Sequence, residues 1–456
     1  MRFEHPEHPG RSVRLAYCLN LHPAEDLDGV LEGMRTITLP LRERLGVRGS
    51  LFGVGPWLPA SVAMELTREE GSPDLDRFVE FFAENELDPF TYNAFPYGGF
   101  HQPGLKSGVF RPTWAAAERL AFTISVAQIA QCLHEVCGGG RNSGHISIST
   151  HSGGYAADLT AAHWGEITEN FCLLALNLSK LEDESGDRIV CAIEPEPRSA
   201  ANDTRELAGL HERILAAAPA VIGGGQSQLR EVAEDIVRHH IGTCLDACHA
   251  AVEFEAPDEA FRGATSGGAP LGKLQFSSAL VLDRPDENHT AREHFLALDE
   301  PVYLHQVTGQ KGDLRPRTHD LGPLAEAYTE GASEWRDCDE WRCHFHVPVD
   351  LQLDSRAKGL RTTRPEADAT LQAALSAPER WGSMELHVEI ETYTWNVLDP
   401  SLRGPGALLE GLEREYRHVL ERLDHAGWKL VGGGPKKPQE LPRFSSTRVD
   451  TPPGPE

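Results

Sequence analysis

The sequence predicts an α/β fold, namely a single (β/α)8 TIM barrel with an insertion between its seventh and eighth strands. Short apolar runs rich in Val, Ile and Leu alternate with longer segments of helical periodicity along most of the 456 residues. Such repeated alternation indicates a parallel sheet, and a barrel with insertions reaches this length as one domain. Several of the apolar runs also end in polar residues, as barrel strands do where their carboxyl ends surround a pocket.

Seven strands and the helices between them are expected in the first 300 residues. The strands are residues 13–19, 50–54, 89–95, 145–150, 189–193, 241–245 and 273–280. The helices are residues 26–45, one that begins at Ser72 as cap and Pro73 as first helical residue, 114–136, 163–181, two segments divided by Gly223 to Gly225, and 287–298. Each strand is thus followed by a helix that can return the chain to the start of the next parallel strand.

The regular alternation of strands and helices becomes less clear after residue 300. Strands are expected at residues 302–307 (VYLHQV), 343–349 (CHFHVPV) and 384–392 (MELHVEIET), with helices around 321–335 and 408–423. Ten candidates are two too many for a barrel, so we assign the first two to an insertion of about residues 300–380. The alternatives are that CHFHVPV is a barrel strand in place of LQFSSAL, or that the sheet is open and doubly wound. The absence of G-x-G-x-x-G after the first strand and of a P-loop disfavours the open sheet. The domain is expected to span residues 1–430, with a disordered tail from 431 to 456 that is rich in Gly, Pro and Lys.

Composition narrows the class of protein. The formal net charge of −26 and the lack of a Lys/Arg-rich stripe argue against nucleic acid as a partner. Nine cysteines without regular spacing fit reduced thiols better than a disulfide framework. We see neither a secretory signal nor a run of about 20 apolar residues, so we expect a cytoplasmic protein without a membrane span.

The polar strand ends predict a carboxylate-rich site. The fifth strand ends in Glu194 and the sixth in Asp246, while the last carries His387, Glu389 and Glu391 at a period of two, on one face. If that face is the barrel interior, buried carboxylates need a cation or a proton. An oxygen-rich site of this kind suits Mn²⁺, Mg²⁺ or Co²⁺, and one imidazole broadens the choice toward Zn²⁺.

Such a metal would polarise a sugar carbonyl and its neighbouring hydroxyl, while one carboxylate takes a proton from the adjacent carbon and another returns it. This chemistry is that of an isomerase or epimerase. Each residue also has a structural alternative: Asp246 could cap the next helix, and His249 could be a satisfied core residue. Cys338, Cys343, His344 and His346 could suggest zinc, but their spacing matches no standard finger and reads equally well as a strand.

The strand ends IEPEPR, LDACH and IETY resemble those of the xylose isomerase-like barrels, which include sugar 3-epimerases, inosose dehydratases and the abasic-site endonuclease IV. The resemblance implies a metal and substrate site made of Glu194, Asp246, His249 and Glu391. It implies that the two glutamates are both metal ligands and acid/base groups, and that His249 contacts the substrate. Dimerisation, common in the superfamily, is expected on the same ground.

Further motifs resemble the EboE-type "metabolite traffic" proteins. They are YNAFPYGGFH (residues 92–101), Phe110 to Trp114, SIST (147–150), HFHVPV and ETYTW, and the resemblance runs from residue 17 to residue 395. The reaction of that group is not settled, so the resemblance implies the fold more than the activity. It leaves open a non-catalytic role, in which the barrel binds and passes on a small metabolite.

One departure concerns the fourth metal ligand. The seventh strand offers Gln275 where the epimerases have a histidine, so His346 or His305 from the insertion would have to fill that place. The residues expected to contact a small-molecule substrate are His249, Arg198, Asn93, His101 and Glu389, with His22 a weaker candidate. An abasic-site endonuclease is the third hypothesis, and the acidic charge of the chain argues against it.

Overall fold

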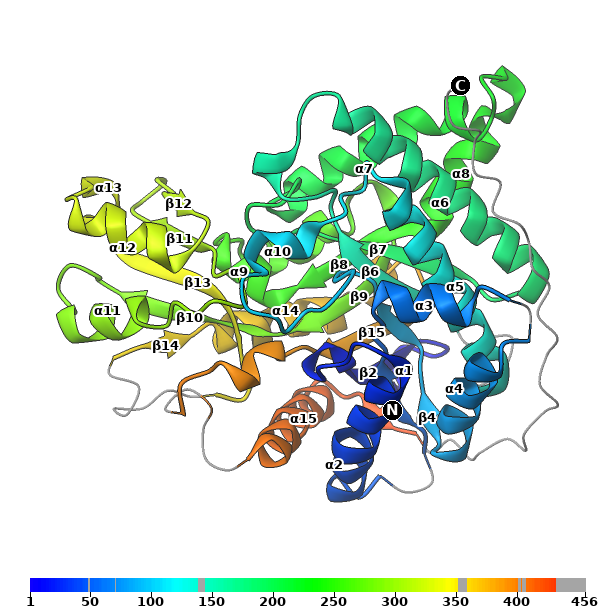
Figure 1. The fold of residues 1–456 in the computed structure, drawn as a ribbon, viewed down its shortest axis with the longest axis horizontal. Coiled ribbons are helices and arrows are strands. Elements are labelled where there is room, and N and C mark those ends of the chain that lie inside the picture. Colours follow the sequence, from blue (N-terminus) through cyan, green and yellow to red (C-terminus); the bar gives the residue numbers. More distant parts are fainter. Residues whose placement is uncertain are drawn as a thin grey trace.

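The computed structural model describes residues 1–47, 50–69, 71–137, 144–351, 359–400, 403 and 407–431. Its centre is a ring of parallel strands surrounded by helices, with a second sheet beside it (Figure 1). The expected tail beyond residue 431, residues 138–143 and part of the expected insertion lie outside the described residues.

The parallel strands pair in the order expected for a barrel. They are β2 (Ser12–Cys18), β3 (Phe52–Gly55), β4 (Leu87–Asp88), β5 (Thr91–Asn93), β6 (Ile146–His151), β7 (Ile189–Glu194), β8 (Ile241–Asp246), β9 (Leu271–Phe276) and β15 (Glu385–Ile390). β4 and β5 follow one another directly and act as two halves of one strand. Since β15 pairs with both β9 and β2, the sheet curls until its last strand meets its first. The antiparallel strands β1 (Arg2–Glu4) and β16 (Lys429–Leu430) extend it beside β2.

Helices connect the strands and cover the outside of the ring. They are α1 (Leu27–Gly33), η2 (Met34–Thr38), α2 (Leu39–Arg44), α3 (Ala60–Leu66), α4 (Pro73–Glu84), α5 (Ala117–Cys137), α6 (His163–Ser185), α7 (Thr204–Val221), α8 (Arg230–His240), α9 (Ala247–Val252), α10 (Pro257–Ala264), α14 (Arg364–Ser376) and α15 (Leu408–His425). The expected helices agree with these, and α4 begins at Pro73 after Ser72 as predicted. Helix α5 is long and apolar enough to cross a membrane by length and composition alone. However, 56% of its most apolar window is buried inside the protein, as in the core helix of a barrel.

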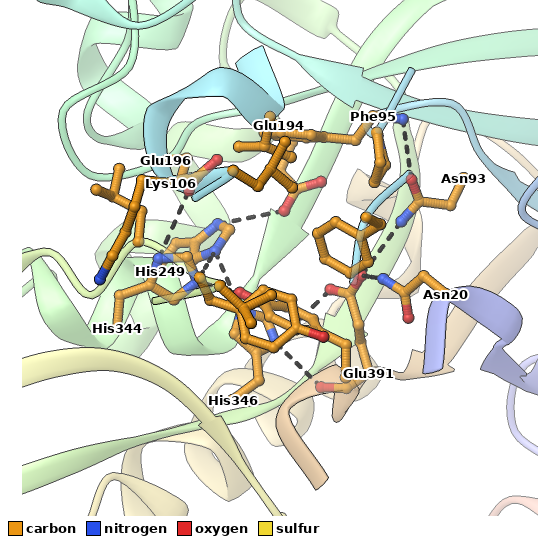
Figure 2. Close-up of a pocket in the computed structure, with 18 residues that line it drawn as sticks. Asn20, Asn93, Phe95, Lys106, Glu194, Glu196, His249, His344, His346 and Glu391 are labelled. Carbon is orange, nitrogen blue, oxygen red and sulfur yellow. Dashed lines mark hydrogen bonds and ion pairs between the residues drawn. The ribbon is translucent and has the colours of Figure 1, made fainter. Parts of the chain in front are cut away.

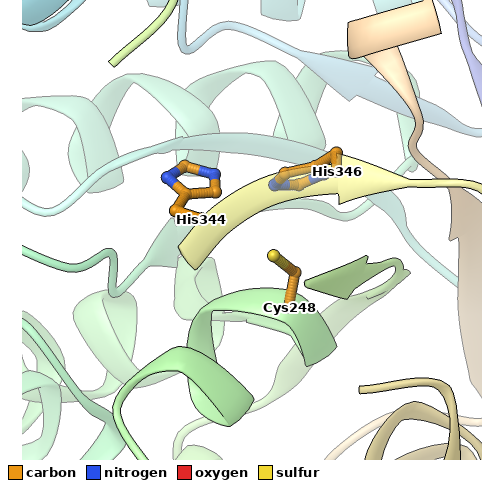
Figure 3. A group of neighbouring side chains, drawn as sticks. All are labelled: Cys248, His344 and His346. Carbon is orange, nitrogen blue, oxygen red and sulfur yellow. The ribbon is translucent and has the colours of Figure 1, made fainter. Parts of the chain in front are cut away.

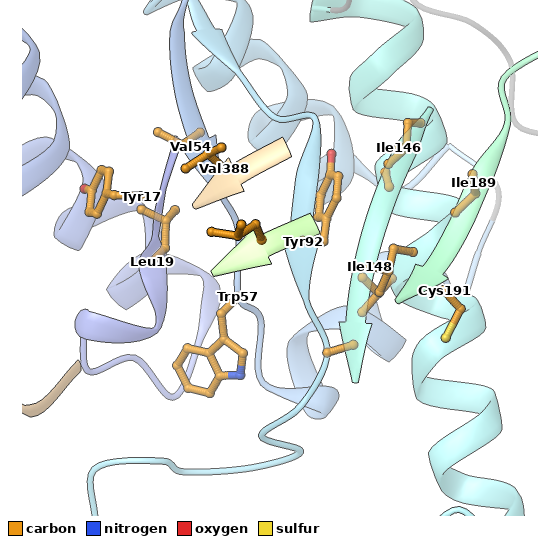
Figure 4. Packing of buried hydrophobic residues seen from close by; sticks show 14 of the residues in the cluster. Tyr17, Leu19, Val54, Trp57, Tyr92, Ile146, Ile148, Ile189, Cys191 and Val388 are labelled. Carbon is orange, nitrogen blue, oxygen red and sulfur yellow. The ribbon is translucent and has the colours of Figure 1, made fainter. Parts of the chain in front are cut away.

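Strand alternation separates an outer apolar layer from a polar barrel interior. On β6, Ile146 and Ile148 belong to the hydrophobic core between strands and helices (Figure 4). Ser147 and Ser149, between and beyond them, bond instead to groups inside the ring: the Ser147 hydroxyl contacts His387 Nδ1 at 2.8 Å, and Ser149 accepts from Lys273 Nζ at 3.1 Å. The period of two in the sequence therefore divides each strand between a packing face and a functional face.

A second sheet of five antiparallel strands is formed by the chain between β9 and β15. It consists of β10 (Ser278–Asp283), β11 (Val307–Gln310), β12 (Arg317–Thr318), β13 (Glu340–Val347) and β14 (Arg361–Thr362), in the order β12-β11-β13-β10-β14, with helices α11 (His289–Leu296), α12 (Leu321–Thr329) and α13 (Ser333–Arg336). Its own apolar core includes Trp335 and Trp341. The sheet lies to one side of the ring in Figure 1 and begins before residue 300, where the insertion was expected to start. The expected domain limits stay a prediction.

Two sequence assignments were wrong in detail. The run of residues 302–307 is not a strand, because β11 begins only at Val307. The single strand expected at residues 273–280 is two strands, β9 and β10, separated by Ser277. Ser277 lies where the chain leaves the ring for the second sheet, and its hydroxyl donates to Asp246 at 2.8 Å.

Candidate functional site

A pocket opens at the carboxyl ends of the parallel strands, between the ring and the second sheet (Figure 2). Its polar lining comes from both: Asn20, Asn93, Lys106, Glu194, Glu196, His249, His344, His346 and Glu391. Its apolar walls are Phe95, Pro96, Phe100, Leu105, Val109, Val302, Tyr303, Leu304 and Tyr393. Apolar walls around a few converging polar groups are the usual form of a small-molecule site.

Three carboxylates meet at one end of the pocket. Glu194 is the last residue of β7, Asp246 is the last residue of β8, and Glu391 follows β15, so strand register brings all three to the same edge of the ring. One oxygen from each lies within 4.8 Å of the other two, and all three side chains are buried. The sequence prediction that these strand ends converge agrees with this geometry.

Neighbouring side chains fix two of these carboxylates. Asn20 and Asn93 both donate to Glu391 Oε1, at 2.7 and 3.2 Å. Asp246 Oδ1 accepts from Ser277 Oγ at 2.8 Å and from the His249 backbone N–H at 2.9 Å, which makes Asp246 the cap of α9. Asp246 therefore does cap the helix, as the structural alternative proposed, but only its Oδ1 takes part. Asp246 Oδ2 is buried and has no hydrogen-bond partner in the described part of the chain.

Histidines from the second sheet complete the site. His344 and His346 sit two residues apart on β13, so both side chains leave the same face of the strand, toward His249 of α9. His249 Nε2 lies 3.0 Å from His344 Nε2 and 3.3 Å from His346 Nε2. Imidazole nitrogen therefore lies beside the carboxylate oxygens, and Asp246, His249 and His346 also offer ligand atoms within 4.8 Å of one another.

Burial shifts the proton affinities of these groups. Removal from water, and then the neighbouring carboxylates, raise the pKa of Glu194 and of Glu391 well above the ordinary range. Burial also raises the pKa of Glu196 to about 8 and lowers that of His249 to about 4. Burial lowers the pKa of His346 as well, so both histidines are neutral and present a lone pair to the site.

One buried cation lies deeper in the ring. Lys273 Nζ donates to Glu389 Oε2 at 2.6 Å and also to Ser149 Oγ and the Tyr92 carbonyl, each at 3.1 Å. Its charge acts to lower the pKa of both Glu194 and Glu391, although burial outweighs that effect. Glu389 is consequently paired in the interior and does not line the pocket where a substrate would contact it.

The remaining expected site residues are spread around this centre. Gln275 is buried in the ring, where its Oε1 accepts from the Cys244 thiol at 3.0 Å, and it is not part of the pocket lining. Arg198 is ion-paired with Glu253. His101 contacts the Tyr303 hydroxyl at 2.6 Å and the Asn20 carbonyl at 2.8 Å, behind the pocket wall.

His305 and His22 also point elsewhere. His305 Nε2 lies 3.0 Å from Glu300, and His22 Nε2 lies 3.2 Å from the Tyr17 hydroxyl. The candidates for the fourth ligand were Gln275, His305 and His346. Of these three, His346 lines the pocket. Asn93 and His249, expected to contact the substrate, line the pocket as well.

Polar residues that line the pocket but were not expected there are Asn20, Lys106, Glu196, Tyr303, His344 and Tyr393. Glu196 lies only two residues beyond Glu194, and His344 was assigned to an ordinary strand. The alternation of CHFHV did place His344 and His346 on one face, but nothing in the sequence indicated that this face turns toward the ring. Asn20 and Tyr393 follow the first and last parallel strands directly, a position at which polar residues could have been flagged.

The donor set fits a divalent metal ion. Three carboxylates that share one buried place need positive charge or protons, and one oxygen among them has no other partner. Carboxylate oxygens with one or two neutral imidazoles suit Mn²⁺, Co²⁺ or Zn²⁺ better than Ca²⁺.

No protein-family model matches this chain, and no curated protein does. Among solved structures, L-ribulose 3-epimerase is 12% identical, with a TM-score of 0.43 over 91% of this chain and 95% of that one. The IOLI protein with a bound zinc atom is 11% identical, with a TM-score of 0.41 over 91% and 99%. 3-Keto-D-glucoside 4-epimerase from E. coli is 14% identical, with a TM-score of 0.31 over 58% and 78%.

Proposed function

We propose that this protein is a divalent-metal-dependent isomerase or epimerase of the xylose isomerase-like type, acting on a small sugar, polyol or cyclitol. The observation that carries the proposal is the convergence of Glu194, Asp246 and Glu391 at the end of a pocket formed by strand ends. The pocket has apolar walls and polar groups at one end, which suits a small hydroxylated molecule rather than a polymer.

The metal ligands in this proposal are Glu194, Asp246 and Glu391, with His346 as the additional candidate. His346 is preferred over Gln275 because its ring lines the pocket, whereas the Gln275 amide is engaged with Cys244. When bound, a divalent ion polarises a carbonyl and a neighbouring hydroxyl of the substrate.

Glu194 and Glu391 are proposed as the acid/base pair. Both side chains line the same pocket, where one carboxylate can take a proton from a carbon next to a carbonyl while the other carboxyl returns one. The two amides on Glu391 Oε1 leave Oε2 as the oxygen that exchanges the proton. The rings of Phe100, Tyr303 and Tyr393 pack against one another and restrict water at the pocket wall.

A carrier role of the EboE type is the second candidate. The motifs that carry that resemblance are those that build the pocket: YNAFPYGGFH supplies Asn93, HFHVPV supplies His346, and ETYTW supplies Tyr393. A pocket that only binds and passes on a metabolite would use the same residues without proton transfer. Turnover therefore separates the two candidates.

The test starts with the metal content of the purified protein by mass spectrometry, beside Glu194→Gln and Glu391→Gln variants. Near-stoichiometric Mn, Mg, Co or Zn in the parent that is lost in both variants supports the proposal. The control is Glu385→Gln, which removes a buried carboxylate at the amino end of β15, outside the pocket, and should retain the metal. A parent protein that takes up none of these ions after incubation would overturn the metal-dependent function.

Sugars and cyclitols are then screened in D₂O by NMR. Deuterium entering the carbon next to the carbonyl reports proton transfer by the protein, even where the equilibrium lies far to one side. Incorporation that requires the metal and is lost in Glu391→Gln supports the isomerase. Binding of a sugar without incorporation would favour the carrier.

A further inference from the structure

We propose that His249, His344 and His346 form a second cation position, beside the carboxylates, which takes a borderline metal ion such as Zn²⁺. The inference goes beyond the proposed function, which needs a single ion at Glu194, Asp246 and Glu391. It rests on the three imidazole rings that converge between α9 and β13 and on the partners of their outer nitrogens.

The outer nitrogen of two of these rings faces a carbonyl oxygen. His249 Nδ1 lies 3.2 Å from the Pro195 carbonyl, and His346 Nδ1 lies 3.0 Å from the Glu391 carbonyl. A carbonyl can only accept, so both Nδ1 atoms must carry the hydrogen. In a neutral ring, Nε2 then holds a lone pair instead of a hydrogen.

The position of the hydrogen on His344 follows from the side-chain amide of Gln306, whose orientation is set by its own hydrogen bonds. Gln306 Nε2 donates to the Pro197 carbonyl and to Glu196, each at 3.0 Å, which leaves Gln306 Oε1 to face His344 Nδ1 at 2.6 Å. Because Oε1 only accepts, His344 Nδ1 also carries the hydrogen. All three Nε2 atoms therefore carry lone pairs, with His249 Nε2 between those of His344 and His346, and the Tyr393 hydroxyl lies 3.2 Å from His344 Nε2.

Lone pairs that face one another at 3.0 and 3.3 Å repel unless a positive charge lies among them. The Tyr393 hydroxyl can donate to His344 Nε2, but the neighbours of His249 Nε2 and His346 Nε2 among the described residues are other imidazole nitrogens, and a metal ion beside them would satisfy these lone pairs. Hydrogen bonds from the outer nitrogens to carbonyl and amide oxygens are also the usual second-shell support of histidine metal ligands. Three imidazoles select Zn²⁺, Co²⁺, Ni²⁺ or Cu²⁺ over Mg²⁺ and Mn²⁺.

The two positions are adjacent but chemically different. Asp246 belongs to the carboxylate group with Glu194 and Glu391, and it also lies within ligand distance of His249 and His346. Asp246 therefore lies between the oxygen position and the nitrogen position, and its Oδ2 has no hydrogen-bond partner among the described residues. When both are filled, we assign His346 to the nitrogen position, because its Nε2 faces His249.

Cys248 lies across β13 from His344 and His346 in Figure 3, and its Sγ falls within 4.8 Å of a ring nitrogen of each. Its backbone N–H is used in a bond to Ser277 Oγ at 3.1 Å. We therefore assign the nitrogen position to the three histidines without Cys248.

The experiment measures how many ions the full-length protein retains after incubation with Zn²⁺ and dialysis. We expect two per chain in the parent and one in His344→Ala, since His344 belongs only to the nitrogen position. The matched control is His305→Gln, which replaces a buried histidine just before β11 whose Nε2 faces Glu300, and it should retain two. Far-UV circular dichroism and thermal unfolding check each variant, and His344→Gln replaces His344→Ala if the latter does not fold.

Cobalt loading distinguishes this inference from the proposed function. Co²⁺ held by three imidazoles with few other ligands absorbs visible light far more strongly than six-coordinate Co²⁺ among carboxylates. We expect that strong band in the parent and in Glu391→Gln, and its loss in His344→Ala. A parent that binds only one Zn²⁺, or a His344→Ala protein with parental stoichiometry and spectrum, would overturn the second position. Loss of the carboxylate-bound ion alone would instead count against the proposed isomerase.

Discussion

At the scale of single residues, Lys273 and Glu389 show how the interior of the ring holds opposite charges without water. Both side chains are fully buried, and Lys273 Nζ donates to Glu389 Oε2 at 2.6 Å. Glu389 Oε1 has no hydrogen-bond partner among the described residues. The carboxylate therefore depends on Lys273 for most of its stabilisation.

Replacement of Lys273 by Met should destabilise the protein strongly. The variant leaves Glu389 buried without its cation, which typically costs about 3–5 kcal/mol. The double variant Lys273→Met with Glu389→Gln removes both charges and should recover a large part of that loss. Denaturant unfolding at pH 7 measures both free energies. A single variant within about 1 kcal/mol of the parent would contradict a stabilising role for this ion pair.

The order of the strands explains why three of the expected site residues lie together. Glu194, Asp246 and Glu391 end parallel strands, and the geometry of such strands makes their ends meet, so their convergence could be expected from order in the sequence. Gln275 and Glu389 were expected at the site because their strands carry them toward the interior. They lie deeper than the pocket, because the depth of a side chain in a barrel depends on stagger between strands, which the sequence does not display.

At the scale of elements, helix α15 is tied to the site by one buried carboxylate. Glu415 Oε2 accepts from Thr392 Oγ1 at 2.6 Å and from the Val349 N–H at 3.2 Å, while Oε1 accepts from Trp395 Nε1 at 3.2 Å. These bonds hold the segment after β15, which includes Tyr393 of the pocket wall, and the segment after β13. Burial, with Asp350 adding to it, raises the pKa of Glu415 to about 7.

This raised pKa predicts a pH dependence of stability with a definite sign. Between the ordinary pKa of about 4.5 and about 7, the unfolded chain loses the Glu415 proton while the folded chain keeps it. The folded state then binds more protons, so the contribution of Glu415 to the free energy of unfolding falls as pH rises, by about 3 kcal/mol over the window. Below this window and above it, the contribution is constant.

Glu415→Gln should remove that part of the pH profile. We expect the stability of the variant relative to the parent to increase from pH 4.5 to pH 7 and then level off, as measured by urea unfolding across this range. Glu421→Gln, on the exposed side of the same helix, is the matched control and should follow the parent. A constant difference between Glu415→Gln and the parent would contradict a buried, protonated Glu415.

The strands and helices of the ring could be predicted because each shows the hydrophobic period of a strand or of a helix. The arrangement of the second sheet could not be predicted in this way. The segment 302–307 has the composition of a strand, but its backbone instead forms the pocket wall with Val302, Tyr303 and Leu304. The site depends on β13, whose pairing with β10 and β11 brings His344 and His346 over the ring. Pairing between strands about 60 residues apart in sequence is a tertiary property that no local pattern records.

At the scale of the whole molecule, the proposed ions would join two sheets that otherwise have separate hydrophobic cores. One core fills the space around the ring, and the other lies within the second sheet. The carboxylates belong to the ring, whereas His344 and His346 belong to β13. A cation bound between them must be released before the second sheet can move away from the pocket.

Removal of metal should therefore loosen β13 selectively. A ligand held at 100 times its dissociation constant stabilises the bound state by about 2.7 kcal/mol, which corresponds to about 100-fold slower opening-limited exchange. Hydrogen-exchange mass spectrometry of the protein with Zn²⁺ and after chelation tests this. We expect amides of β13 and β10 to exchange faster after chelation, while β6, on another part of the ring, keeps its rate. In His344→Ala the difference between the two conditions should shrink at β13, because one of the links between the sheets is already lost. Equal protection of β13 with and without metal would mean that side-chain packing, and not a shared ion, fixes the second sheet over the pocket.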